Sequence, residues 1–239
     1  MVAGPRVASV PRMLPFTRDQ FIAVFADYNR AAWPAPVFAY LLGAAMVAML
    51  LRPSRAADRF IGSGLGLMWI WTGIAYHALR FSAINPLALA FAALFVAQGA
   101  LLFQAVSVDG GLRFRGSDGP ARLPGAVLIA YAAIVYPLVG LWTGHDVRAL
   151  PMFGITPCPV TLFTLGLLLL AAPPVPRRVL PIPLLWSLIG ASAAFLLDVV
   201  QDWPLLLGAV VIPWIAWRDR RRPQRSATAA PAAAPLGRR

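Results

Sequence analysis

The sequence predicts an all-α protein, a polytopic bundle of about seven transmembrane helices preceded by an amphipathic helix on the membrane surface. Two observations carry this prediction. The chain of 239 residues is 59% hydrophobic and only 13% charged, whereas soluble domains are about 45–50% apolar. Its apolar residues are gathered in long runs, and the arginines lie between and after those runs. The chain is therefore expected to lie in a lipid bilayer.

The predicted spans follow from the apolar runs. A membrane-crossing helix needs about 20 residues, so the fifth and seventh runs must borrow flanking residues, thin the bilayer or stay partly re-entrant. No run contains Asp, Glu, Lys or Arg, so an intramembrane proton or ion relay is not expected. The runs are 35–51, 60–79, 84–106, 123–143, 157–172, 179–197 and 203–217.

The arginines predict the orientation, with the N-terminus outside and the C-terminus inside. Short cytoplasmic loops retain positive charge, and the arginines of segments 52–59, 113–122 and 177–178 and of the tail from 218 fall on one face. The opposite face has only Arg80 and Arg148 in its loops, besides the arginines of the N-terminal segment. This distribution indicates topology, not a nucleic-acid groove, so the lipid bilayer is the expected partner and nucleic acid is not.

The chain divides into three predicted regions. Residues 1–13 form a disordered extension without a signal-peptide core, and Met13 is an alternative start to Met1. Residues 14–217 form a single integral membrane domain. Residues 218–239 form a basic, disordered cytoplasmic tail. Within the domain, the glycine-rich segment 107–122 is predicted to be a flexible cytoplasmic connector.

An interfacial helix is predicted over residues 17–31. Thr17 and Gln20 have the spacing of a capping box, and Phe16 can form a hydrophobic staple with Phe21. Trp33-Pro34 ends the helix. A soluble packing helix is the alternative to a helix on the membrane surface. Its apolar positions recur at helical spacing, at Phe21, Val24, Phe25 and Tyr28.

Small residues predict close packing between spans. Gly62, Gly66 and Gly73 share one face of the second run with His77, and Gly190 belongs to a similar stripe on the sixth. Such stripes let transmembrane helices approach closely. We therefore expect His77 to point into the bundle, as a hydrogen-bonded packing residue or as part of a site.

Prolines mark three further structural positions. Pro137 lies inside its run and frees the carbonyl of Ala133, which neighbouring helices are expected to satisfy. Thr156 fits an N-cap, and Pro157 fits the first helical position of the run that contains Cys158. Pro157 and Pro159 remove two amide donors from that first turn, which favours a structural helix entry.

Candidate ligands gather at the predicted outward face: His77, His145, Asp146 and Cys158 could bind a small solute or a metal. No CxxC, HxxxH or HExxH spacing supports the metal. No Gly-x-Ser-x-Gly turn supports hydrolysis. No catalytic residue and no cofactor are therefore expected, and the chain is predicted not to be an enzyme.

Several short segments together resemble a bacterial family of multi-pass inner-membrane proteins of unknown function. The resemblance covers about residues 14–217 and leaves out both tails. It implies a location in the bacterial inner membrane and favours Met13 as the start, and it implies no activity, cofactor or site. The segments are Leu14-Pro-Phe-Thr17 with Gln20-Phe21, Tyr76-His77 with Ile84-Asn85-Pro86, and Gly154-Ile-Thr-Pro-Cys-Pro159 with Thr161, Phe163-Thr164 and Gly166.

Two classes of function remain open from the sequence. The first is a transporter or binder of a small solute or metal at the outward face, and the sequence favours it. The alternative is a non-catalytic accessory or assembly protein that acts through a protein partner. Substrate, partner and oligomeric state are left open.

Overall fold

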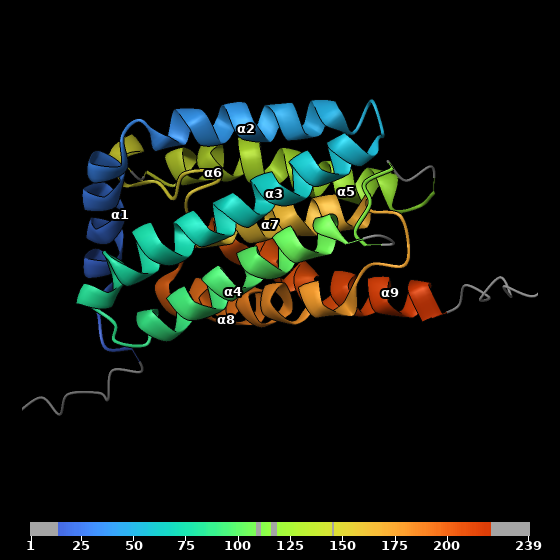
Figure 1. Ribbon diagram of the computed structural model, residues 1–239. Coiled ribbons are helices and arrows are strands. Elements are labelled where there is room, and N and C mark those ends of the chain that lie inside the picture. The colour runs from blue at the N-terminus through green and yellow to red at the C-terminus, as the bar shows by residue number, and fades with distance from the viewer. Residues whose placement is uncertain (1–13, 109–110, 116–118, 145, 221–239) are drawn as a thin grey trace, which may run out of the picture.

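The computed structural model describes residues 14–108, 111–115, 119–144 and 146–220. Within these ranges every regular element is helical, and the one β-contact is an isolated bridge between Phe114 and Ala171. The helices α2 to α9 lie side by side in a roughly common direction, and α1 crosses one end of them (Figure 1). The α-helices are α1 (Arg18–Ala32), α2 (Ala35–Met49), α3 (Arg55–Trp71), α4 (Ala88–Ser107), α5 (Arg122–Ala130), α6 (Tyr136–Trp142), α7 (Pro157–Leu169), α8 (Pro181–Leu197) and α9 (Gly208–Arg220).

Short helices of other types extend or connect these α-helices. The π-helix η1 continues α3, the π-helix η3 joins α5 to α6, and the 3-10 helix η6 leads into α9. The predicted extension 1–13 and nearly all of the predicted tail lie outside the described residues. The short helices are η1 (Thr72–Ala78), η2 (Phe81–Ala83), η3 (Tyr131–Val135), η4 (Val147–Ala149), η5 (Arg177–Val179) and η6 (Val200–Leu207).

Four helical segments of the described chain are long and apolar enough to cross a membrane, and a fifth is added if α1 and α2 count as one bent span. That pair is bent by 84° at its break. The helix α7 is apolar but has only 13 residues. The predicted all-α class is thus confirmed, with four to five candidate spans by length and composition. The four segments are Ala88–Ser107, Arg122–Trp142, Arg177–Leu197 and Val200–Arg220.

The start of α1 has the local structure that the sequence predicts. The Thr17 hydroxyl accepts from the Gln20 amide at 3.2 Å, and the Gln20 side chain accepts from the Thr17 amide at 2.8 Å. The rings of Phe16 and Phe21 stack with centroids 5.8 Å apart. Both interactions join residues at most five apart, so they need no distant partner, and they fix where the crosswise helix begins.

The glycines of α3 and η1 lie against α4. A methyl group added at Gly66 would meet the Gly99 carbonyl at 3.0 Å, and one at Gly73 would meet the Ala92 carbonyl at 2.9 Å. At Gly62 the added carbon would overlap Val106. No larger side chain fits at these contacts without moving a helix backbone, so the stripe sets the distance between α3 and α4.

The helix α7 forms the centre of the bundle (Figure 1). Every residue of α7 except Cys158 is buried. The backbones of α5 and α7 approach so closely that a methyl group on Gly166 would lie 2.8 Å from the Gly125 carbonyl. Since other helices surround it, α7 presents almost no surface to its surroundings. Its shortness is therefore compatible with a central position.

The connector between α4 and α5 is packed where the structure describes it, which corrects the prediction of a flexible segment. Leu112 and Phe114 are fully buried. The Phe114 amide donates to Asp58 Oδ1 at 2.7 Å, and the Arg113 carbonyl accepts from the Ala172 amide at 2.8 Å. Glycine-rich composition favours turns but does not prevent their side chains from packing. The connector is thus anchored to α3 and to the chain after α7.

Candidate functional site

Two regions of the described chain are candidate ligand sites. The first, which we call the acid–thiol centre, consists of Tyr136, Cys158, Trp186 and Asp202 and lies inside the bundle. The second, which we call the α1 groove, is a cavity between α1, the first half of α2 and the segment formed by α3 and η1. The two regions differ in polarity: the centre contains a carboxyl group, and the groove is lined mainly by apolar side chains.

By its position in the sequence, Asp202 lies between the sixth and seventh apolar runs, outside both. The structure instead places it in η6, inside the candidate span Val200–Arg220, with only 4% of its surface exposed. The predicted runs contain no acidic residue, but this candidate span starts three residues before the seventh run and includes Asp202 as its third residue. The seventh predicted run contains only the apolar residues 203–217 and so begins after Asp202. The helical segment Val200–Arg220 begins before it.

Tyr136 and Cys158 surround the Asp202 carboxyl group. The Tyr136 hydroxyl donates to Asp202 Oδ1 at 2.5 Å. The Cys158 thiol lies beside the carboxyl group and the Tyr136 hydroxyl. These residues come from α6, α7 and η6, which are far apart in sequence, so the centre forms only when the bundle is assembled.

Trp186 of α8 closes another side of the centre. Its indole lies next to the Cys158 thiol. A methyl group on Gly190 would lie 3.7 Å from the indole nitrogen and 3.8 Å from the Cys158 sulfur. The glycine thus keeps α8 close to both groups. Cys158 is the one residue of α7 that is only partly buried, and its sulfur lies against Asp202, Tyr136 and Trp186.

The centre contains a buried acid without a basic partner. Within the described chain, the two ion pairs are Arg80–Asp27 and Arg218–Asp219. The Trp186 indole nitrogen has no hydrogen-bond partner in the same part of the chain. A carboxyl group that meets only neutral donors and aromatic rings can hold a proton or a small cation, because ring faces attract positive charge.

His77, the first predicted ligand, lies in an aromatic cage next to the centre. It is fully buried, and neither ring nitrogen has a hydrogen-bond partner among the described residues. The Trp186 ring lies 5.0 Å from the His77 ring and also contacts Cys158, so it stands between the two. The other rings around His77 are Tyr76 at 5.1 Å, Phe91 at 5.8 Å and Phe95 at 4.7 Å.

Asp146 and His145 do not join Cys158 in what the structure describes. Asp146 is exposed and caps η4, since its Oδ1 accepts from the Arg148 amide at 2.8 Å. His145 lies outside the described residues. Within the described part of the chain, no three His, Cys, Asp or Glu side chains converge to hold a metal ion.

The prolines singled out in the sequence have structural surroundings. Pro157 and Pro159 are buried in the first turn of α7, and Thr156 occupies the N-cap position. The carbonyl of Ala133, which Pro137 leaves without its helical donor, accepts from the Tyr40 hydroxyl at 3.0 Å. A neighbouring helix therefore satisfies this carbonyl, and the proline opens no solute path there.

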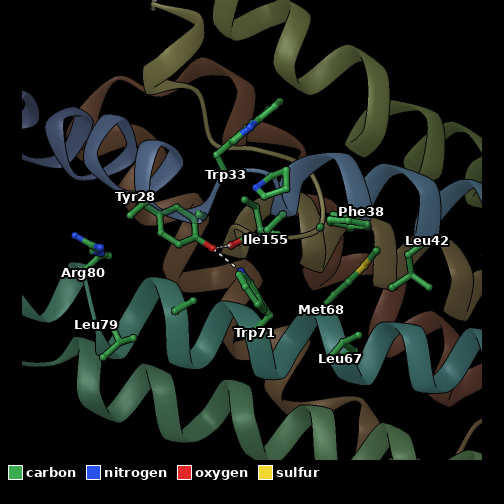
Figure 2. Close-up of a pocket in the computed structure, with 17 residues that line it drawn as sticks. Tyr28, Trp33, Phe38, Leu42, Leu67, Met68, Trp71, Leu79, Arg80 and Ile155 are labelled. Carbon is green, nitrogen blue, oxygen red and sulfur yellow. Dashed lines mark hydrogen bonds between the residues drawn. The ribbon is translucent and has the colours of Figure 1, made fainter.

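The α1 groove has a volume of about 600 Å³ and an almost wholly apolar wall (Figure 2). Its few polar groups pair with one another. Tyr28 donates to the Ile155 carbonyl at 2.9 Å, and the Trp71 indole donates to the Tyr28 hydroxyl at 2.9 Å. Burial raises the pKa of the Tyr28 phenol above its usual value, so the hydroxyl stays protonated and keeps its donor. Other lining residues include Trp33, Phe38, Leu42, Leu67, Met68, Leu79 and Arg80.

Comparison with protein families matches residues 18–227 to a family of unknown function, DUF6064. Neither the curated proteins nor the solved structures contain a match. The matched range includes the acid–thiol centre and every residue that lines the α1 groove. Both regions therefore lie within the part of the chain that the family shares, and the protein belongs to the DUF6064 family.

Proposed function

We propose that the protein crosses the bacterial inner membrane seven times, with its N-terminus outside and its C-terminus inside. The crossings are α2, α3 with η1, α4, α5 to α6, α7, α8, and η6 with α9. The connections that contain most of the loop arginines lie at one end of the bundle, and α1 lies at the other (Figure 1). Positive charge stays on the cytoplasmic side, which supports this orientation.

Labelling of Cys158 tests the orientation. A membrane-impermeant maleimide added to intact cells should modify Cys158 from outside, but more slowly than an exposed thiol, because Cys158 is only partly exposed and lies at the start of α7. Asp146→Cys, at an exposed position of the same predicted face, gives the reference rate. Modification that occurs only in inside-out vesicles, for both thiols, would reverse the orientation.

We further propose that the protein binds a small cation in the acid–thiol centre and carries it across the membrane. The observation behind this proposal is Asp202, a buried acidic side chain inside an apolar candidate span. Asp202 is the third residue of this span, and ionisable residues within transmembrane segments are costly and often mark proton, ion or substrate pathways. A metal is not part of the proposal, because the described residues offer no set of three ligands.

The surroundings of Asp202 favour a monovalent cation over an anion. The carboxyl group supplies negative charge, and the Tyr136 hydroxyl oxygen is a second polar atom beside it. No described basic residue pairs with Asp202, so an anion would find no favourable charge. A proton or a small organic ammonium ion meets these requirements, and the two can be distinguished by experiment.

Flux in proteoliposomes tests the proposal. Proton movement would be followed with an enclosed pH-sensitive dye, and ammonium ions with radiolabelled small amines. Asp202→Asn should reduce flux to that of empty liposomes, since an amide cannot carry the charge. The matched control is Asp198→Asn, four residues earlier, at an exposed position with φ of 54° that asparagine tolerates.

Two outcomes would contradict cation transport. One is wild-type flux equal to that of empty liposomes for protons and for every amine. The other is equal flux in Asp202→Asn and Asp198→Asn. Either result would favour the accessory or assembly role, which a stoichiometric partner in a detergent pull-down with crosslinking would then support.

A further inference from the structure

The α1 groove is shaped by the sharp turn between α1 and α2. The two helices are bent by 84° at their break. As a result, α1 closes one end of the space between α2 and α3 (Figure 2). Residues Gly154 and Ile155 close the inner wall. The groove therefore opens sideways, toward the surroundings of the bundle, and not into its interior.

The groove is unsuited to a polar solute. Its interior polar groups, the Tyr28 hydroxyl and the Trp71 indole, are used in hydrogen bonds to each other and to Ile155. Large apolar side chains line the rest, and Trp33 and Phe38 remain 69% and 65% exposed. A hydrocarbon chain is the ligand that covers such surface without leaving polar groups unpaired.

The groove has a polar end and an apolar end. Figure 2 shows Arg80 and Leu79 at one end of the groove and Leu42 and Leu67 at the other. The helical segment from Leu67 to Ala78, two residues before Arg80, covers 11 positions, which is roughly 16 Å at 1.5 Å per residue. Half of a hydrocarbon core of about 30 Å is about 15 Å, so the groove matches one leaflet in length.

The charges at the polar end form a pair. Arg80 Nη1 lies 2.6 Å from Asp27 Oδ2, and their side chains are 36% and 57% exposed. Arg80 lines the groove and also a shallow hollow beside it that includes Asp27. A phosphate beside Arg80 and an ammonium group beside Asp27 would complement this pair, whereas a purely anionic head group would be repelled by Asp27.

We propose that the α1 groove binds a zwitterionic aminophospholipid, with one acyl chain along Phe38, Leu42 and Leu67, the phosphate at Arg80 and the ammonium group at Asp27. The inference rests on the membrane placement proposed above but not on cation binding. Lipid recognition of this kind combines a fitted hydrocarbon slot with a few charged groups at the interface. The lipid would hold α1 in its crosswise position over the bundle.

Photo-crosslinking in nanodiscs tests this binding. The probe is a phosphatidylethanolamine with a diazirine near the end of one acyl chain, and labelled peptides are identified by mass spectrometry. Labelling should concentrate on α2 and α3 near Leu42 and Leu67, the far end of the groove. Labelling spread evenly over the outer surfaces of α2, α4 and α8 would overturn the proposal.

Variants that fill the groove supply the control for position. Ala75→Phe and Ala35→Phe place a ring in the cavity from two different walls, and each should reduce groove labelling several-fold. Two variants are used so that one remains informative if the other fails to fold. Ala97→Phe, at an exposed position on α4, should label like wild type. Unchanged labelling in a folded groove variant would contradict the proposal.

The head group is tested with a second probe. A phosphatidylglycerol with the same diazirine chain should label the groove several-fold less than phosphatidylethanolamine, and Asp27→Asn should remove that preference. Equal labelling by the two probes in wild type would overturn the head-group assignment. Asp202→Asn should leave groove labelling unchanged, so failure of cation transport and failure of lipid binding give separate results.

Discussion

The acid–thiol centre and the α1 groove lie in the same bundle but differ in the partners of their buried polar groups. In the centre, a buried carboxyl group meets neutral donors, and the nearby Trp186 nitrogen has no hydrogen-bond partner in the described chain. In the groove, the interior polar groups are paired and the wall is apolar. A buried carboxyl group without a basic partner suits a cation, whereas paired polar groups in an apolar wall suit hydrocarbon.

The two regions also differ in how deeply their side chains are buried. Asp202 and Tyr136 are almost completely buried, while Trp33 and Phe38 at the groove are largely exposed. Helices on all sides must assemble before the centre exists, whereas the groove needs only α1, α2, α3 with η1, and the segment near Ile155. Substitutions should therefore cost more stability in the centre than in the groove.

The largest loss of stability is expected for Tyr136→Phe. The substitution removes the hydrogen bond to Asp202 and leaves a buried carboxyl oxygen without its donor, which costs about 1–3 kcal/mol. Thermal unfolding in detergent measures the change. Tyr131→Phe is the matched control, because its partly buried hydroxyl donates to the Gln201 backbone carbonyl, and it should cost less. Equal losses in both variants would contradict a special role for the Tyr136–Asp202 bond.

A moderate loss is expected for Tyr28→Phe in the groove. The hydroxyl both donates to Ile155 and accepts from Trp71, and hydrogen bonds of this kind contribute about 0.5–1.5 kcal/mol each. The bond to Trp71 is only partly buried, so we expect a total loss near the lower end of about 1–3 kcal/mol. The apolar ring still packs in place, so the groove keeps its shape. We expect a lower unfolding temperature with acyl-chain labelling close to wild type. Loss of labelling in a folded variant would show that the hydroxyl itself contacts the ligand.

Local sequence patterns predicted some elements well. The capping box at Thr17 and Gln20 and the stack of Phe16 on Phe21 involve residues close in sequence, so their spacing alone was sufficient. The close contacts of the glycine stripe with α4 likewise follow a helical repeat on one segment. The resemblance to a family of unknown function agrees with the family match over residues 18–227.

Long-range features could not be predicted in the same way. Asp202 lies outside the predicted seventh run because a charged residue ends the apolar pattern, although η6 and α9 form one helical segment that includes it. Its neighbours Tyr136 and Cys158 come from other helices, and no spacing in the sequence relates them. The groove depends on the 84° bend after α1. A useful signal was present in Asp202 itself, an acid six residues before Gly208 in an otherwise apolar stretch.

The smallest change in stability is expected for Arg80→Gln. Its ion pair with Asp27 is substantially exposed, and exposed pairs contribute about 0–1 kcal/mol. Unfolding temperature should therefore stay close to wild type, while groove labelling by both lipid probes should fall because the phosphate that they share loses its cation. Arg30→Gln, at an exposed position on the same helix as Asp27, is the control for a change in surface charge. If Arg80→Gln instead lowers stability as much as Tyr136→Phe, the ion pair holds α1 to η1 in its own right, and the charged end of the groove then serves the fold and not a lipid head group.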